Sequence, residues 1–357
     1  AGMKYFVITT KHHEGFCLWD TKQTDYKATN TPAGRDLVAP MVDAFREEGL
    51  KVGFYYSLID WHHPEFTIDR LHPLRDEDPK RKLNKKRDQK KYAAYMREQV
   101  KELLTQYGKI DIMWFDFSYP GDDGKGHRDW ESEKLLKVVR ELAPDVIIDN
   151  RLDLDGAHDF VTPEQWQPGS GFKDEKGNPV VWEACQTFSG SWGYHRDEQT
   201  WKSVPQLIGM LVDNVSKGGN LLLNVGPTGR GEFDYRALER LEGMGRWMKY
   251  NSRSIYNCGP SEYQAPTDCR YTQNGKRLYL HLLAWPFGMV QCPGLEGKVE
   301  YAQFLHDASE VIIDRKPEDA HDKYGQAEVR WPKGVLNLKL PTIKPPVDVP
   351  VIELFLK

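Results

Sequence analysis

Acidic and imidazole side chains follow several short apolar runs in this chain of 357 residues. The clearest run covers residues 110–115, is rich in Ile, Met, Trp and Phe, and stops at Asp116. Apolar residues on both faces are typical of a buried parallel strand. An acid after such a strand is often a turn or cap residue. In a β/α barrel, however, the carboxyl ends of the strands build the active site.

The same pattern recurs along the chain, which favours the catalytic interpretation of Asp116. Polar and aromatic residues follow the predicted strands 4–10, 52–57, 146–148 and 180–182. In a β/α barrel these strand ends share one rim. We expect that rim to carry His12, His13, Tyr55, Trp61, Asp116, Arg151, Glu183 and Trp192.

Two carboxylates beside aromatic rings suit glycoside hydrolysis. One carboxylate acts as nucleophile or base, and the other protonates the leaving oxygen. Histidine and arginine side chains would hydrogen-bond to sugar hydroxyls. Because adjacent residues of a strand point to opposite faces, His12 and His13 could be divided between core and cleft, and we expect at least one to serve the site.

Strands alternate with helices from residue 4 to about residue 250, which predicts a parallel sheet with crossover helices. Helices are expected at 37–48, 92–107, 135–142, 204–218 and 238–248. Only five firm strands and a weak one at 160–161 are apparent, whereas a closed barrel needs eight. We therefore expect one or two β/α units to be missing upstream of Ala1. An opened barrel exposes strand edges, so the isolated chain should be poorly soluble or nearly inactive.

The pattern changes after residue 256. Short strands are predicted at 277–283, 311–313, 335–340 and 351–356, with a hairpin signal at Asn274-Gly275. This is typical of an antiparallel β-sandwich. We predict a catalytic barrel, truncated at its N-terminus, over residues 1–255 and a sandwich over residues 256–357.

Composition narrows the function classes. A net charge of -4 argues against a nucleic-acid binder. The sequence contains no apolar run of about 18 residues, so no membrane span is predicted. The five Cys lack zinc-site spacing, although Cys258, Cys269 and Cys292 could include one disulfide. The basic stretch 75–91 is either a phosphate-binding patch or, as we prefer, a solvated loop.

Several of these segments resemble α-L-fucosidases of glycoside hydrolase family 29. They are residues 11–19 (KHHEGFCLW), 53–57 (GFYYS), 114–116 (WFD), 182–185 (WEAC), 191–194 (SWGY) and 218–227 (GGNLLLNVGP). The resemblance runs in unbroken order from residue 4 to about residue 256. It implies a β/α barrel with a C-terminal sandwich and a retaining exo-glycosidase that needs no cofactor or metal.

The resemblance also implies residue roles. Asp116 matches the nucleophile, which would attack the anomeric carbon of a terminal fucose and form a covalent fucosyl-enzyme that water resolves. Trp192 matches an aromatic residue near the fucose methyl group. The family's upstream strand, whose end carries a further fucose-binding His, is absent from this sequence. Fucose-binding positions are matched by His12, His13, Tyr55, Trp114 and Arg151.

The acid/base residue has two candidates. Glu164 lies where several family members carry this residue, in the stretch 162–164 (TPE). Glu183 follows its predicted strand more tightly, and the barrel rule alone favours it. We choose Glu164 and keep Glu183 as the alternative. A retaining mechanism needs its two carboxyl groups about 5–5.5 Å apart.

Two other function classes remain. One is a non-catalytic protein that binds fucose or another carbohydrate. The other is a metal-dependent barrel hydrolase, although no HxH or HExxH spacing is present; its ligands would be His12, His13, His62, His63 and Asp116. The expected partner is a fucosylated glycan or glycoconjugate, while linkage preference and homo-oligomer formation stay open. An export signal for the expected periplasmic, secreted or lysosomal location would lie upstream of Ala1.

Overall fold

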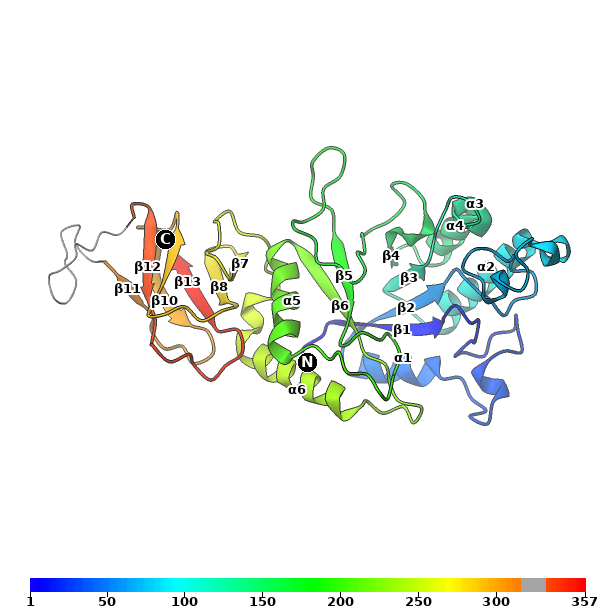
Figure 1. Cartoon of the computed structure of the whole chain (residues 1–357), viewed down its shortest axis with the longest axis horizontal. Coiled ribbons are helices and arrows are strands. Elements are labelled where there is room, and N and C mark those ends of the chain that lie inside the picture. The colour runs from blue at the N-terminus through cyan, green and yellow to red at the C-terminus, as the bar shows by residue number, and fades with distance from the viewer. Residues whose placement is uncertain (316–331) are drawn as a thin grey trace. The chain divides into compact units, whose positions relative to one another are not determined.

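The computed structural model describes residues 1–315 and 332–357. Its contacts divide it into two compact units. We call residues 3–161 the N-terminal unit, and residues 162–357 together with Ala1 and Gly2 the C-terminal unit. Figure 1 labels the elements of both. The predicted boundary between residues 255 and 256 stays a prediction.

The N-terminal unit contains a four-stranded parallel sheet in the order β1-β2-β3-β4. Its strands are β1 (Tyr5–Lys11), β2 (Lys51–Ser57), β3 (Ile112–Asp116) and β4 (Ile147–Ile148). The α-helices are α1 (Val38–Glu47), α2 (Gln89–Gln106), α3 (His127–Trp130) and α4 (Ser132–Leu142). Short 3-10 turns are η1 (Ala28–Asn30), η2 (Pro73–Arg75), η3 (Lys82–Lys86) and η4 (Asn150–Leu152).

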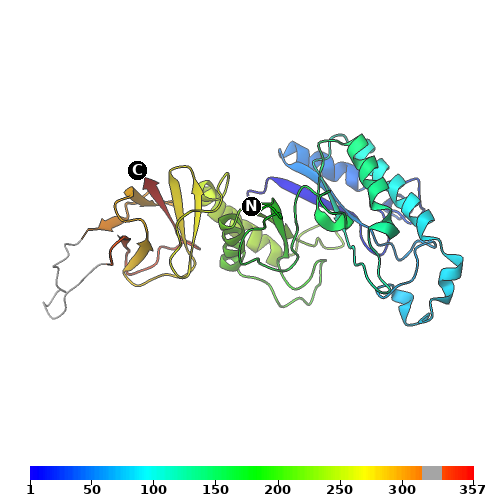
Figure 2. The same cartoon turned by 90° about the horizontal axis from the view of Figure 1, so that it is seen from above.

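The two faces of this sheet differ. Val52, Phe54 and Tyr56 of β2 belong to the core cluster that contains apolar residues of α1, α2 and α4. Figure 2 shows these helices, coloured blue to green, gathered beside β1. Side chains alternate along a strand, so Tyr55 and Ser57 lie on the opposite face. Residues of β3 alternate in the same way, and Asp116 shares the face of Tyr55.

The C-terminal unit begins with a parallel pair, β5 (Trp182–Thr187) and β6 (Gly219–Asn224). Helices α5 (Val204–Ser216) and α6 (Tyr235–Asn251) and the turn η5 (Ser252–Ser254) complete this part. The helix predicted from residue 204 is confirmed, and a capping box starts it, because Ser203 and Gln206 each accept a hydrogen bond from the other's backbone N–H.

Two antiparallel sheets follow, in the orders β10-β13-β8-β7 and β11-β12-β9. Their buried residues, among them Leu280, Leu338 and Leu354, form one core. The predicted hairpin at Asn274 is confirmed between β7 and β8. The strands are β7 (Cys269–Asn274), β8 (Arg277–Leu282), β9 (Met289–Pro293), β10 (Val299–Phe304), β11 (Ile312–Asp314), β12 (Val335–Lys339) and β13 (Val351–Leu356).

The parallel α/β arrangement is as predicted, but the closed barrel is not found. Across residues 1–315 and 332–357, the parallel strands form one four-stranded and one two-stranded sheet. The weak strand predicted at 160–161 is only an isolated bridge between Asp149 and Phe160. These strands are fewer than the eight that close a barrel.

The suggested disulfide is wrong. All five Cys are free thiols. Cys269 and Cys292 lie in the core of the antiparallel sheets, where a thiol packs as a small apolar group. Burial raises the pKa of Cys269 to about 12 and that of Cys292 to about 11. Among the described helices, none is long and apolar enough to cross a membrane.

Candidate active site at the ends of β1 to β4

Asp116 is the last residue of β3, and its side chain is 9% exposed. Its Oδ1 accepts a hydrogen bond from Arg151 Nη1 at 2.6 Å. Its Oδ2 accepts a hydrogen bond from the Tyr55 hydroxyl at 2.5 Å. Each oxygen of the carboxylate is therefore held by a donor from a different element, which fixes the plane of the carboxylate.

The strand register explains this convergence. Tyr55 pairs with Trp114 and Ser57 pairs with Asp116, so the Tyr55 ring lies on the same face, next to the carboxylate. Arg151 comes from η4, directly after β4. Its guanidinium lies 4.6 Å from the centre of the Trp114 ring, a cation–π contact that orients it toward Asp116.

His12 and His13 lie close together rather than on opposite faces. β1 ends at Lys11, so strand alternation no longer applies to them. Their ring centres are 4.0 Å apart. The His12 ring is exposed and nearly parallel to the Tyr55 ring, and the two ring centres are 5.5 Å apart. The His13 ring is half-buried and lies edge-on to the Phe117 ring, and the two ring centres are 4.9 Å apart.

The protonation of His13 follows from its partner Ser57, the last residue of β2. The Ser57 hydroxyl donates to the carbonyl of Ile59 at 2.9 Å, so it accepts from His13 Nδ1 at 2.7 Å. This assigns the hydrogen to Nδ1 and leaves Nε2 as an acceptor. Burial, reinforced by the neighbouring His12, lowers the pKa of His13 to about 3.

A second carboxyl group, that of Asp149, belongs to the residue that directly precedes η4. Asp149 is fully buried, and burial raises its pKa well above the ordinary value, although Arg151 opposes the shift. Desolvation of this kind favours the neutral form of an acid. The Arg151 guanidinium therefore has Asp116 as its ionised partner.

Trp61 lies in the N-terminal unit, and the centre of its ring is 5.4 Å from that of His13. Three further predicted site residues, Glu164, Glu183 and Trp192, belong to the C-terminal unit. Glu164 is exposed and forms an isolated parallel bridge with Cys185 of β5. Glu183 is buried, and the prediction that its strand ends there is wrong, because β5 starts at Trp182 and continues to Thr187. The residues before it are not strand, and the Val181 side chain is 58% exposed. The roles of both acids stay predictions.

Trp192 lies in the loop between β5 and α5, and its side chain is 38% exposed. Its carbonyl accepts a hydrogen bond from the Asn224 amide at 2.5 Å. Glu198 fixes the same loop by accepting hydrogen bonds from the hydroxyls of Ser191 and Thr200, each at 2.6 Å. These bonds lower the pKa of Glu198 to about 2. An exposed indole on an anchored loop is suited to contact with a ligand.

Sequence reasoning missed Ser57 and Phe117. Ser57 follows Tyr55 at the two-residue spacing of a strand face, and this signal was available. Phe117 contacts His13 only through the fold, and nothing in its local sequence indicates that contact. Within the described residues, no three His, Cys, Asp or Glu side chains come together in a way that could hold a metal ion.

Comparison with known proteins shows which protein family this chain resembles. The family model described as Alpha-L-fucosidase matches residues 1–253. The plasma alpha-L-fucosidase of Rattus norvegicus is 32% identical over 333 residues, which cover 88% of this chain. The match covers 65% of the rat protein, so the chain spans less than two thirds of that relative's length.

Solved structures agree with this match. Alpha-L-fucosidase isoenzyme 1 from Paenibacillus thiaminolyticus is 47% identical, with a TM-score of 0.90 over 100% of this chain and 84% of that chain. A GH29 alpha-L-fucosidase from Bacteroides thetaiotaomicron, trapped as a covalent intermediate with 2-fluoro-fucosyl fluoride, is 27% identical. Its TM-score is 0.82 over 100% of this chain and 79% of that one.

Proposed function

The chain belongs to the α-L-fucosidase family, and from this membership we propose that it is a retaining exo-α-L-fucosidase. Its substrate is a glycan or glycoconjugate with a terminal α-linked L-fucose. The reaction proceeds by double displacement through a covalent fucosyl-enzyme. The trapped covalent intermediate of the Bacteroides thetaiotaomicron relative supports this mechanism.

The observation that carries the proposal is the environment of Asp116. A nucleophilic carboxylate has to be ionised and correctly oriented. The Arg151 guanidinium favours the ionised form, and Tyr55 together with Arg151 fixes its orientation. One oxygen can then attack the anomeric carbon while the other stays hydrogen-bonded.

In the first step, an Asp116 oxygen forms a bond to C1 of fucose as the bond from C1 to the leaving oxygen breaks. Glu164 donates its proton to that oxygen, and the glycan departs as an alcohol. In the second step, Glu164 accepts a proton from water, and the water oxygen attacks C1. Fucose leaves and Asp116 regains its negative charge.

The remaining residues bind the sugar. His13 offers Nε2 as an acceptor for a fucose hydroxyl, because Ser57 holds its hydrogen on Nδ1. His12, Tyr55 and Trp114 complete the polar and aromatic lining of the fucose site. Trp192 packs near the fucose methyl group. Neither a cofactor nor a metal takes part in this mechanism.

In this proposal the two parallel sheets are parts of a (β/α)8-like barrel that the described strands do not close, and an antiparallel β-sandwich follows them. Support comes from the TM-score of 0.90 with the Paenibacillus thiaminolyticus fucosidase and from the parallel and antiparallel sheets of the chain itself. Residues 1–255 form the catalytic domain, and residues 256–357 form the sandwich.

Trapping tests the nucleophile. The chain is incubated with 2-fluoro-fucosyl fluoride, and its intact mass and peptide map are measured. We expect the addition of one fluorofucosyl group, located on Asp116. A label on another acid would refute the assignment. A folded chain that binds fucose but takes no label would instead be the non-catalytic carbohydrate-binding protein.

Azide rescue tests the acid/base. In Glu164→Ala, turnover of natural glycosides should fall strongly, turnover of aryl fucosides with good leaving groups should fall less, and azide should restore the rate. Glu183→Ala is the matched comparison. If Glu183→Ala alone gives this pattern, Glu183 is the acid/base.

A further inference from the structure

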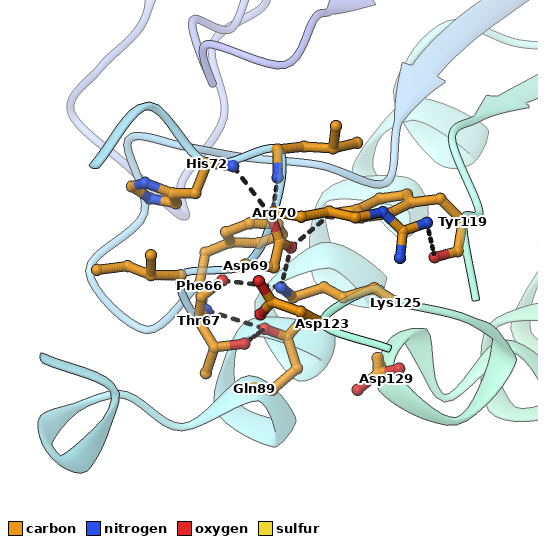
Figure 3. Close-up of polar contacts among 12 residues, drawn as sticks. Phe66, Thr67, Asp69, Arg70, His72, Gln89, Tyr119, Asp123, Lys125 and Asp129 are labelled. Atoms are coloured by element: carbon orange, nitrogen blue, oxygen red, sulfur yellow. Dashed lines mark hydrogen bonds and ion pairs between the residues drawn. The ribbon is translucent and has the colours of Figure 1, made fainter. Parts of the chain in front are cut away.

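A buried ion pair joins the loops that follow β2 and β3. Asp69 lies in the loop 58–72, and Lys125 lies in the loop 117–126. Their side chains are in direct contact, as Figure 3 shows. Each side chain is 3% exposed. Neither residue reaches Asp116 in the hydrogen bonds described above, so the proposed mechanism does not use them.

Other polar groups complete the environment of this pair. The second loop contributes the Tyr119 hydroxyl, which donates to Asp69 at 2.6 Å. Asp69 also accepts from the backbone N–H groups of Leu71 at 2.9 Å and His72 at 3.0 Å. These bonds and the Lys125 ammonium outweigh burial and hold the pKa of Asp69 below its ordinary value.

The Lys125 ammonium is equally well coordinated. It donates to the carbonyl of Thr67 at 2.8 Å and lies 4.4 Å from the centre of the Phe66 ring. Backbone hydrogen bonds between Tyr119 and Lys125, at 2.8 and 3.1 Å, close the second loop on itself. The position of Lys125 is therefore fixed relative to Tyr119.

Arg70 adds a second connection between the same loops. Its guanidinium donates to the carbonyls of Asp122 at 2.8 Å and Tyr119 at 3.0 Å, as Figure 3 shows for Tyr119. Its backbone N–H donates to the carbonyl of Asp123 at 3.1 Å. The two loops thus behave as one body that is attached to the ends of β2 and β3.

This body reaches the candidate active site through Phe117. Phe117 follows Asp116 directly and has a φ of 83°, a left-handed conformation that is costly for a residue with a side chain. The centre of its ring lies 5.6 Å from the centre of the Tyr119 ring and 4.9 Å from the centre of the His13 ring. The surrounding loops must impose such a conformation.

The next residue makes a second link to the site. The Ser118 hydroxyl donates to the carbonyl of Arg151 at 2.7 Å and accepts from the Trp130 indole at 3.0 Å. The segment 117–119 thus contacts His13 with one residue and the backbone of Arg151 with the next. A shift of this segment would move both groups relative to Asp116.

We propose that the Asp69–Lys125 pair, together with Tyr119, is a positioning device that holds Phe117 in its left-handed conformation and thereby aligns Asp116, His13 and Arg151. This inference rests on the proposed fucosidase function. In this proposal Asp69 and Lys125 are positioning residues, because they act on the site through Tyr119 and Phe117.

Stability alone does not explain the pair. Replacing a buried ion pair with well-packed hydrophobic residues of similar volume is often neutral or stabilising, because it removes the desolvation cost of both charges. Removing one partner alone is strongly destabilising, since a buried charge remains. The test therefore uses the double variant Asp69→Asn/Lys125→Met, which removes both charges at once.

The matched control is Arg97→Met/Glu131→Gln. This removes a 2.6 Å ion pair of the same unit in which both side chains are 17% exposed. It joins α2 to the residue between α3 and α4. Melting temperatures are measured for both double variants. The values of kcat and KM on an aryl fucoside are then determined at a temperature well below the lower of the two melting temperatures.

For Asp69→Asn/Lys125→Met we expect kcat to fall roughly 10- to 100-fold with KM within about twofold, because a small misplacement of reacting groups costs rate more than binding. Labelling by 2-fluoro-fucosyl fluoride should slow in parallel. The control should keep the wild-type kcat. A folded Asp69→Asn/Lys125→Met variant with wild-type kcat, or an equal fall in the control, would overturn the proposal.

A double-mutant cycle tests the route through Phe117. In a Phe117→Gly background, loss of the ion pair should cause little additional fall in kcat, because the left-handed conformation costs glycine little. If the fold-decreases in kcat caused by Phe117→Gly and by loss of the ion pair multiply, the two changes act independently and this route is refuted.

The imidazole NMR signals of His13 separate this inference from the proposed function. They should shift in Asp69→Asn/Lys125→Met and stay unchanged in the control, because the Phe117 ring lies against His13. Unchanged signals in the first variant would refute the positioning role. If the wild-type chain takes no fluorofucosyl label, the function fails, while these signals still decide the role of the pair.

Discussion

Asp116 in β3 and Glu353 in β13 are both buried carboxylates on strands, yet their surroundings differ. Asp116 is the last residue of a parallel strand, and its donors come from β2 and η4. Glu353 lies in the middle of an antiparallel strand and accepts from Gln303 of β10 at 2.8 Å and from Arg253 of η5 at 3.1 Å.

This difference separates two uses of a buried charge. In the middle of a strand, the neighbouring strands occupy the space beside the carboxylate, so its bonds brace the fold. At the end of a parallel strand, loops surround the carboxylate, and loops leave room for a ligand. The comparison predicts that changes near Asp116 alter turnover and that changes near Glu353 alter stability.

The largest effect should come from the two carboxylates themselves. Asp116→Asn should lower turnover by on the order of 10⁴-fold or more, as expected for loss of a nucleophile, and it should also lower the melting temperature, because Arg151 loses its ionised acceptor. Glu353→Gln should keep turnover and lose about 1–3 kcal/mol of unfolding free energy, because its arginine partner loses an ionised acceptor. Rates on an aryl fucoside and urea unfolding measure both. Comparable turnover in the two variants would remove the distinction.

Leu354→Ala tests the structural side of the comparison. Leu354 is fully buried in the core of the antiparallel sheets. Its truncation should cost about 3 kcal/mol of unfolding free energy through lost burial and a cavity. The turnover of the folded fraction should be unchanged. A fall in kcat well below the melting temperature would show that this core also supports catalysis.

Tyr55→Phe tests the catalytic side with a smaller change. The variant removes the 2.5 Å hydrogen bond to Asp116 and keeps the aromatic ring. A hydrogen bond to a charged group is worth about 2 kcal/mol, so kcat should fall roughly 30-fold while the fold stays intact. If the rates of Tyr55→Phe and the wild type agree, the tyrosine does not orient the nucleophile.

The smallest effect concerns His281, which is fully buried in β8. The Thr272 hydroxyl donates to the carbonyl of Ser254, so it accepts from His281 Nε2 at 2.9 Å, and Nδ1 has no hydrogen-bond partner. Burial lowers the pKa of His281 to about 3 from the ordinary 6.5. As the pH falls below 6.5, the unfolded chain takes up this proton first, and the folded state loses stability toward pH 3.

His281→Gln should therefore flatten the pH dependence of unfolding by up to about 1.4 kcal/mol per pH unit below pH 6.5. The glutamine amide can still donate to Thr272. Urea unfolding of both proteins at pH 7, 6 and 5 measures the difference. His13 and His72 have lowered pKa values too, so the wild-type slope is steeper than that of one group. Parallel curves would show that His281 does not contribute.

The elements with strong local signals were predicted correctly. The apolar run before Asp116 identifies β3, and the capping residues Ser203 and Gln206 identify the start of α5. β7 was missed because its sequence, CRYTQN, is polar and gains its burial from the neighbouring strand β8. Val180 and Val181 look like a strand but precede it, which misplaced the end of β5.

The site was predictable only as a set of residue types. The sequence indicates that Asp116, Tyr55 and Arg151 follow or end strands, but the two hydrogen bonds between them depend on strand register. The Asp69–Lys125 contact has a separation of 56 residues and no periodic pattern. Contacts of this kind arise from tertiary packing, which a single sequence does not encode locally.

The alternating faces of β2 have a consequence for how this protein can change over time. Phe54 and Tyr56 serve the helices, whereas Tyr55 and Ser57 serve the candidate active site. Substitutions on the face of Tyr55 and Ser57 should therefore alter the candidate active site and leave the packing of the helices in place. A single-residue insertion ahead of Tyr55 has the opposite result: it turns the whole strand over and exchanges the two sets of side chains. Natural variation in β2 should therefore consist of replacements and not of insertions or deletions.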